Sequence, residues 1–337
     1  MEYEPITTMI IALKTRCHII TLIFILGLSA GCNKNETPLR LAHIGWPGYE
    51  TLTLAKTKGL YNNLEVTLYR PSNTTDTMLS LQNNIVDVAA ISLNSLIKFQ
   101  HSIDEPLVII AVLDISHGVD VIIANSEINS IKHLKGKRLG MEPTALGAFF
   151  VLKAIESSTE IDLNQVQLLP ITIENHKNMF LSGKIDAIAT YAPAASEILK
   201  KKGHVIFDSS RIPNQIVDVL ITRESYASQH PDKIKKLLNG YFNAIEFTKS
   251  QPDHAIAEMA KIENIEPFQY KKSLEGIHIP DLDSNYALLD GEESKLKSTM
   301  ENIKTVLEAN NIINLENDTL PNINSDFLPE NNKKLRP

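Results

Sequence analysis

Cysteine is almost missing from this 337-residue sequence, and its scarcity limits the chemistry that the chain can carry. The two cysteines, Cys17 and Cys32, both lie near the N-terminus. Because no cysteine follows Cys32, the rest of the chain forms no disulfide and contains no thiol nucleophile. If the protein is exported, it therefore needs no disulfide, and its sequence after Cys32 exposes no reactive free thiol to an oxidising environment.

Basic patches and catalytic signatures are missing as well. The formal net charge is −7 and the longest basic run is Lys200–Lys202, which argues against nucleic acid as a partner. The sequence contains no G-x-S-x-G, H-E-x-x-H, P-loop or G-x-G-x-x-G motif. His117, His133 and His176 lie apart, without the spacing of metal ligands. We therefore expect no enzyme, no metal site and no cofactor.

One apolar run stands at the N-terminus. Ile19–Leu28 follows Lys14 and Arg16, and it is too short to span a bilayer. This pattern is typical of a signal-peptide core, which we expect within residues 1–31. An uncleaved signal anchor is the alternative, and translation begins at Met1 or at Met9.

The residues around Cys32 resemble a bacterial lipobox, in which the cysteine is lipidated and becomes the first residue. Ser29, Ala30 and Gly31 precede it, with Ser29 where leucine is commoner. We expect residues 32–38 to form a lipidated N-terminus and a polar linker. The exported protein would then be anchored by its lipid to a bacterial membrane surface, on the periplasmic face or the cell surface.

Short apolar strands alternate with amphipathic helical stretches after this linker, which predicts an α/β fold with mainly parallel sheets. Ten strands are expected within the segments 39–45, 64–70, 86–92, 107–114, 119–125, 137–142, 166–171, 185–191, 204–208 and 217–223. From Glu224 onward helices are expected, including one that begins near Pro231 and one over 295–312.

The strand series runs twice with a nearly constant offset, which predicts two lobes of like topology. The matching pairs are Arg40 and Arg138 (offset 138 − 40 = 98), Asp87 and Asp186 (186 − 87 = 99), Asp114 and Asp208 (208 − 114 = 94), and Asp120 and Asp218 (218 − 120 = 98). Asn84 and Gly183 match as well, each at a left-handed helix cap. We expect lobe I over 39–122 plus 219–328, lobe II over 123–218, and a polar tail over 329–337.

Aromatic and polar residues gather where the expected strands end. Ligands in open α/β sheets lie beyond the carboxyl ends of the strands, so these loops predict a ligand cleft between the lobes. The alternative is that Trp46 and Tyr49 only cap their own sheet. The predicted ligand-binding residues are Trp46, Tyr49, Glu50, Ser92, Asn94, Asp114, Asp120, Glu142, Thr144, Tyr191 and Asp218.

Two of these acids lie at or beside apolar strands, where an unpaired carboxylate is costly to bury. Asp120 and Asp218 therefore line the floor of a cleft, pair with Arg138 or Arg211, or face water on an edge strand.

The order of these segments resembles one known family. After the lipobox come "GWPGYE", "VDVAAIS", "LDISHGVDVIIA", "LKGKRLGMEPTALGAF", "SGKIDAIATYAPA", "FDSSRIPNQIVDVLITR" and "HPDKIKKLL". From Arg40 to Leu328 the chain is similar to solute-binding lipoproteins of ABC importers. The group in question binds nitrate, sulfonates, taurine and thiamine-pyrimidine precursors.

This resemblance implies a type II periplasmic-binding-protein fold with two lobes, a two-strand hinge at 119–125 and 217–223, and a cleft that closes on a small molecule. The implied partners are an ABC permease and its ATPase, with the binding protein acting as a monomer. The alternatives are a sensor that passes its signal to a membrane protein and, least favoured, an enzyme like the yeast and fungal pyrimidine synthases. Those enzymes use a histidine of their own, iron and a pyridoxal cofactor, but their cysteine-rich motif is missing here.

The ligand class is left open by the resemblance. Sulfonate and nitrate binders of this group hold the anion at a helix N-terminus, and the matching loop here offers Thr144 beside Glu142. Glu50 and the aspartates add negative charge, whereas Trp46, Tyr49 and Tyr191 suit a ring or a cationic nitrogen. We therefore favour a neutral or cationic heterocycle or amine, with sulfonate and nitrate as alternatives.

Overall fold

A computed structural model describes residues 37–330, apart from 101, 104, 292–293 and 314–319. The fold described below belongs to Pro38–Pro337, which separates from Met1–Thr37. The expected signal peptide, Cys32 and the start of the linker lie outside the described residues.

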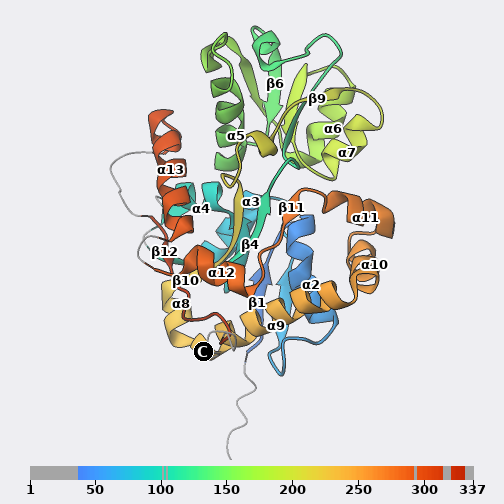
Figure 1. The fold of residues 1–337 in the computed structure, drawn as a ribbon. Helices are drawn as coiled ribbons and strands as arrows, with labels where there is room; N and C mark the ends of the chain where they lie inside the picture. Colours follow the sequence, from blue (N-terminus) through green and yellow to red (C-terminus); the bar gives the residue numbers. More distant parts are fainter. Residues whose placement is uncertain (1–36, 101, 104, 292–293, 314–319, 331–337) are drawn as a thin grey trace, which may run out of the picture. The chain divides into compact units, whose positions relative to one another are not determined.

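The chain forms an α/β fold with two sheets, as predicted (Figure 1). The larger sheet has the order β11-β4-β10-β3-β1-β2, with β12 paired to β4. Its strands are β1 Leu39–Ala42, β2 Val66–Tyr69, β3 Val88–Ser92, β4 Leu107–Ser116, β10 Val217–Arg223, β11 Ile277–His278 and β12 Asn322–Ile323. The smaller sheet has the order β7-β6-β8-β5-β9. Its strands are β5 Val121–Ala124, β6 Arg138–Met141, β7 Gln167–Pro170, β8 Ala187–Thr190 and β9 His204–Asp208.

All ten predicted strands are confirmed, but the expectation of mainly parallel sheets is wrong. Among the described strands, the parallel pairs are β1–β2, β1–β3, β6–β7, β6–β8 and β12–β4. As many pairs are antiparallel: β10–β3, β10–β4, β11–β4, β5–β8 and β5–β9. Four of these five pairs involve β5 or β10, each of which follows a crossing from the other sheet and runs against the direction of its neighbours there.

The two crossings are short and are tied to each other. One runs over residues 117–120, from β4 to β5, and the other over 209–216, from β9 to β10. Ser209 joins them, since its hydroxyl lies 2.9 Å from the Ser116 hydroxyl and accepts from the Gly118 N–H at 2.7 Å. The boundary expected between residues 122 and 123 falls inside β5, and all four residues of β5 pair within the smaller sheet.

Helices flank both sheets (Figure 1). In chain order they are α2 Glu50–Thr57, α3 Thr74–Gln82, α4 Leu93–Gln100, α5 Ala145–Glu156, α6 Ile173–Leu181, α7 Ala194–Leu199, α8 Glu224–Gln229, α9 Pro231–Ser250, α10 Pro252–Ile262, α11 Pro267–Ser273, α12 Leu282–Leu289 and α13 Lys295–Ala309. Pro231 is the first residue of α9, where a missing N–H costs no helical hydrogen bond. The predicted helices at 231–250 and within 295–312 are confirmed.

The C-terminal segment lies along the larger sheet as far as residue 330. β12 pairs with β4, and Phe327 and Leu328 are buried. Asn84 and Gly183 have φ values of 57° and 71°, which confirms the two predicted left-handed caps. Among the described residues, none of the helices combines the length and the apolar character needed to cross a membrane.

The two sheets repeat one strand order: β2-β1-β3-β10-β4 corresponds to β7-β6-β8-β5-β9. They also repeat one ion pair. Asp87 accepts from the backbone and guanidinium N–H groups of Arg40, and Asp186 accepts from the same groups of Arg138. We call these two pairs the arginine–aspartate clamps. The offset seen in the sequence thus corresponds to a repeat in the structure.

Candidate ligand-binding site

The loop after β1 is built around the buried carboxyl group of Asp114. Pro47 begins the short 3-10 helix Pro47–Tyr49, and Trp46 precedes it in an extended conformation. The Trp46 indole Nε1 donates a 3.0 Å hydrogen bond to Asp114 Oδ2. A Cβ atom on Gly48 would lie only 2.0 Å from the same oxygen, so a glycine is required here. Trp46 is therefore held by Asp114 on β4.

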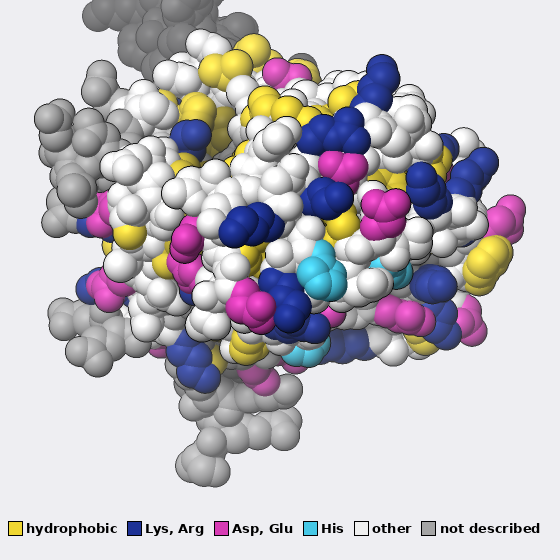
Figure 2. All heavy atoms as spheres, turned by 90° about the horizontal axis from the view of Figure 1, so that it is seen from above, with side chains coloured by type: hydrophobic (Ala, Val, Ile, Leu, Met, Phe, Trp, Pro, Cys, Tyr) yellow, Lys and Arg dark blue, Asp and Glu magenta, His cyan; other side chains and the backbone are white. Residues whose placement is uncertain are grey.

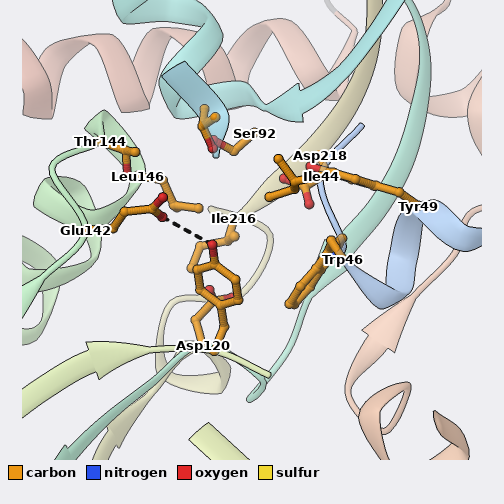
Figure 3. A pocket seen from close by; sticks show the side chains of 12 residues that line it. Ile44, Trp46, Tyr49, Ser92, Asp120, Glu142, Thr144, Leu146, Ile216 and Asp218 are labelled. Carbon is orange, nitrogen blue, oxygen red and sulfur yellow. Dashed lines mark hydrogen bonds between the residues drawn. The ribbon is translucent and has the colours of Figure 1, made fainter. Parts of the chain in front are cut away.

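A cavity lies in front of this loop and is lined by residues from both sheets and both crossings (Figure 3). About 30 Å³ of it is open to the centres of water-sized spheres, more than the ~10–15 Å³ that one bound water needs. The larger sheet and its loops contribute Ile44, Trp46, Tyr49, Thr74 and Ser92, the smaller sheet and its loops contribute Glu142, Thr144, Leu146 and Tyr191, and the crossings and the start of β10 contribute Asp120, Ile216 and Asp218.

Eight of the eleven predicted site residues line this cavity together: Trp46, Tyr49, Ser92, Asp120, Glu142, Thr144, Tyr191 and Asp218. The other three are buried elsewhere. Asp114 lies behind Trp46, Glu50 is turned toward Arg70, and Asn94 is fully buried in the first turn of α4. The Asn94 amide has no hydrogen-bond partner among the described residues.

Glu50 does not bring negative charge into the cavity, which corrects the sequence-based argument. Its side chain is fully buried and receives two hydrogen bonds from Arg70, at 2.6 and 3.2 Å. Arg70 also binds Glu263 at 2.5 Å. The carboxylate of Glu50 is therefore neutralised within its own lobe.

The lining residues that the sequence reasoning missed are Ile44, Thr74, Leu146 and Ile216. Ile44 lies near the end of the first expected strand segment, 39–45, and Leu146 lies within the quoted segment "LKGKRLGMEPTALGAF", but only polar and aromatic residues near the strand ends were predicted to bind a ligand. Thr74 follows β2, so the rule of strand carboxyl ends also predicts its position. Ile216 precedes β10, where that rule gives no signal.

Two aromatic rings from different sheets meet at the cavity. Trp46 and Tyr191 pack edge to face, with centroids 5.4 Å apart and planes at 87°. The Tyr191 hydroxyl donates to Glu142 Oε2 at 3.2 Å (Figure 3). Each half therefore anchors an aromatic side chain on an acid of the same half, Trp46 on Asp114 and Tyr191 on Glu142.

The electrostatics of the cavity are one-sided, because its lining, as far as the described residues go, contains three carboxyl groups and no lysine, arginine or histidine. Burial raises the pKa of Asp120 to about 6 and that of Glu142 to about 7, although hydrogen bonds from Ser116 and Tyr191 oppose the rise. Burial also raises the pKa of Asp218 to about 7 and that of Asp114 above its usual range. The outer surface differs, since Figure 2 shows Lys and Arg interspersed with Asp and Glu on the face that it presents.

Of the three sequence-based interpretations of Asp120 and Asp218, the structure supports the cavity lining. Arg138 pairs with Asp186, and the Arg211 guanidinium lies over the Phe207 ring at 5.5 Å. Both arginines are thus engaged elsewhere.

In the loop that matches the anion-binding loop expected from the family resemblance, one backbone N–H group at the start of α5 is already bonded to a side chain of the same loop. Thr144 is the N-cap of α5, and its side-chain oxygen accepts from the Gly147 N–H at 3.0 Å. Glu142 lies two residues before it and faces the cavity. A bound anion at this helix N-terminus would therefore meet a nearby carboxyl group.

The histidines show no metal-binding arrangement within the described part of the chain. His176 is fully buried and hydrogen-bonds to the Thr190 hydroxyl and the Ile171 carbonyl, both at 2.9 Å. Within residues 37–330, outside the gaps noted above, no three His, Cys, Asp or Glu side chains gather as metal ligands would.

Solved structures similar to this one include binding proteins and an enzyme. The periplasmic aliphatic sulphonate-binding protein SsuA from Escherichia coli matches with a TM-score of 0.69 and 17% identity, over 83% of this chain and 95% of that one. The periplasmic nitrate-binding protein NrtA from Synechocystis PCC 6803 matches with a TM-score of 0.67 and 14% identity, over 84% of each chain. The desulfurization enzyme DszB matches with a TM-score of 0.61 and 13% identity, over 82% and 93%. At these identities the likeness shows the fold alone.

No curated protein matches the sequence. A family model does: the family described as NMT1/THI5 like matches residues 46–255, more than half of the chain. This match and the binding-protein fold confirm the family expected from the sequence. The chain belongs to the NMT1/THI5-like family.

Proposed function

We propose that this protein is an exported solute-binding protein that holds a small molecule between its two sheets and delivers it to the permease of an ABC importer. The observation that carries this proposal is the cavity, which takes its lining from both sheets and from both crossings. A ligand that contacts both halves binds better when they are closed, so it shifts the population toward the closed form. We place the hinge at the two crossings, residues 117–120 and 209–216, a few residues before the boundaries expected from the sequence.

For the ligand we propose a neutral or positively charged nitrogen compound, such as an amine or an amino-heterocycle. The support is the lining: Asp120, Glu142 and Asp218 beside Trp46, Tyr49 and Tyr191, with no basic side chain among them. A cationic nitrogen is attracted both to carboxylates and to aromatic faces. A sulfonate or nitrate would meet three carboxyl groups and, among the described lining residues, no basic side chain.

Cys32 is the proposed site of lipid attachment, which would hold the protein at a bacterial membrane surface as a monomer beside the permease and its ATPase. The motif "SAGC" supports this part of the proposal. Acyl-chain labelling of the wild type and of Cys32→Ser tests it, and equal labelling of the two would count against it.

The decisive experiment is a thermal-shift and calorimetric screen of the purified protein against nitrate, alkanesulfonates, primary amines and aminopyrimidines. A compound present at about 100 times its Kd stabilises the folded state by about 2.7 kcal/mol, which raises the Tm measurably. We expect hits among amines or aminopyrimidines, and we expect Asp120→Asn to weaken them by about tenfold, or ~1.4 kcal/mol. Asp186→Asn is the matched control, because Asp186 lies in a clamp outside the cavity. A hit confined to sulfonates or nitrate would overturn the proposed ligand class.

The likeness to DszB favours a second candidate, an enzyme on the same fold. The same screen separates the two, because a binding protein returns its ligand unchanged. Mass spectrometry of each hit after prolonged incubation with the protein would reveal a product if the protein is an enzyme.

A further inference from the structure

Asp114 and Asp218 form a buried pair of carboxyl groups on the larger sheet. They are direct neighbours across the antiparallel strands β4 and β10. Their exposed fractions are 1% and 7%. Residues directly opposite each other on antiparallel strands project to the same face of the sheet, so the two carboxyl groups are neighbours. Two ionised carboxylates can only accept hydrogen bonds, so a hydrogen bond between these groups needs a proton on one of them.

Within the described part of the chain, the groups that face the pair supply no positive charge. Tyr49, in the 3-10 helix before α2, lies close enough to Asp218 to oppose the rise of its pKa, and Trp46 donates to Asp114. Among the described residues, the other titratable groups that act on the pair are Asp120 from the first crossing, Tyr191 from the loop after β8, Tyr241 from α9 and Tyr270 from α11. The adjacent residue on β3 is Ser92, the strand partner of Asp218. Two buried negative charges side by side would repel each other strongly without a counter-ion, so sharing a proton is the lower-energy arrangement.

The two members of the pair have different surroundings. Asp218 lines the cavity, whereas Asp114 lies behind Trp46 and under Gly48. Asp114 is thus a positioning residue, since it reaches a ligand only through the indole that it holds. Asp218 is the member that a ligand can touch. A change of charge at Asp218 therefore alters the surroundings of Trp46 through one group, the Asp114 carboxyl, to which the indole N–H donates.

We propose that Asp114 and Asp218 share one proton when no ligand is bound, and that a positively charged ligand nitrogen displaces this proton into the solvent. The pair would then select for cationic ligands and couple their capture to the release of a proton. Neutral and anionic ligands leave the proton in place. The displacement step rests on the proposed function, whereas the shared proton does not.

The sole tryptophan gives a direct readout of the shared proton, because its N–H donates to one member of the pair. We would titrate the fluorescence of the ligand-free protein between pH 5 and 9 for the wild type and four variants. Since burial raises the pKa of Asp218 to about 7, the wild-type emission is expected to change through that pH. Asp218→Asn should remove the transition. Asp120→Asn and Glu142→Gln should keep it, although both alter acids of the cavity, and the clamp variant Asp186→Asn should keep it as well.

If the wild-type emission did not change between pH 5 and 9, the proposal of a shared proton would be wrong. It would also be wrong if the transition survived in Asp218→Asn or disappeared only in Asp120→Asn. If Asp218→Asn fails to fold, the infrared difference spectrum of the wild type between pH 5.5 and 8.5 decides instead. It must then show the loss of a protonated-carboxyl stretch as the pH rises, and its absence would refute the proposal. These measurements use no ligand, so their failure leaves the proposed solute binding untouched, and a failed ligand screen leaves the shared proton untouched.

Discussion

The two sheets agree at one end and differ at the other. At the end where β1 and β6 begin, each sheet carries an arginine–aspartate clamp with the same three kinds of hydrogen bond. At the opposite end, the loop after β1 presents Trp46 and Tyr49, and the loop after β6 presents Glu142 and Thr144. The clamps fix strand positions, and the repeated fold needs them in both halves. The strand ends carry the cavity, where the two halves supply complementary parts of one site.

The acids at the two ends also differ in their charge state. The hydrogen bond from Arg138 lowers the pKa of Asp186, whereas burial without a cation raises the pKa of Asp218 to about 7. An aspartate can therefore stabilise this fold as an anion at one end and be held near neutrality at the other. The difference lies in the presence of an arginine partner.

The clamps themselves are unequal, and this predicts the largest mutational effect. Asp87 also lies 3.7 Å from Arg223, whose side chain is only 5% exposed and which donates to the carbonyls of Leu81 and Val86. Asp87→Ala would leave this buried guanidinium without its nearest acid, and we expect a loss of about 3–5 kcal/mol. Asp186→Ala breaks a partly exposed pair and should cost about 1 kcal/mol. Urea unfolding of the two variants measures both values, and equal costs would contradict the inequality.

Much of this architecture is readable from local sequence pattern. The ten strands are short apolar runs, and the helix at Pro231 shows regular apolar spacing, so both were predicted. The direction of β5 and β10 was not predicted, because it depends on the crossings between the sheets and is not reflected in the local sequence. β11 and β12 have two residues each, too few for any periodicity.

The site shows the same division. Trp46 and Tyr191 were found because the rule of strand ends needs only the strands. The role of Glu50 was misjudged, because its partner Arg70 follows the next strand and pairing of this kind is set by tertiary structure. Asp114 and Asp218 were both predicted, but their contact depends on the register between β4 and β10.

The contrast between clamp and cavity acids predicts opposite effects of pH on stability. Between pH 4 and 7 the folded protein keeps a proton on Asp218 that the unfolded chain has lost, since the pKa rises from 3.8 to about 7 on folding. Because the folded state binds one proton more than the unfolded chain in this range, the free energy of unfolding falls by up to about 1.4 kcal/mol for each unit by which the pH rises. Asp218→Asn removes this penalty, so its stability relative to the wild type should improve by on the order of 2 kcal/mol between pH 5 and 7.

Asp186→Asn is the control, because the pH dependence that Asp186 gives to the free energy of unfolding has the opposite sign. The lowered pKa of Asp186 gives stability that is present above about pH 4 and is lost as the pH falls through the folded-state pKa. Its variant should therefore be less stable than the wild type at pH 7 and approach it in acid. Urea unfolding at several pH values measures both profiles. Parallel profiles for the two variants would remove the distinction between clamp and cavity acids.

The smallest expected effect concerns the two aromatic side chains anchored on acids. Tyr191→Phe removes the 3.2 Å hydrogen bond to Glu142 and keeps the ring that packs on Trp46. We expect a loss of about 0.5–1.5 kcal/mol, because one modest hydrogen bond is broken at a partly exposed tyrosine. The emission of Trp46 should stay unchanged, since its own anchor is Asp114. Tyr191→Ala removes the ring as well and should shift that emission, because the edge-to-face contact is lost. If Tyr191→Phe shifted the emission as much as Tyr191→Ala, the two anchors would not be independent, and the halves would be coupled through Glu142 instead of through the rings.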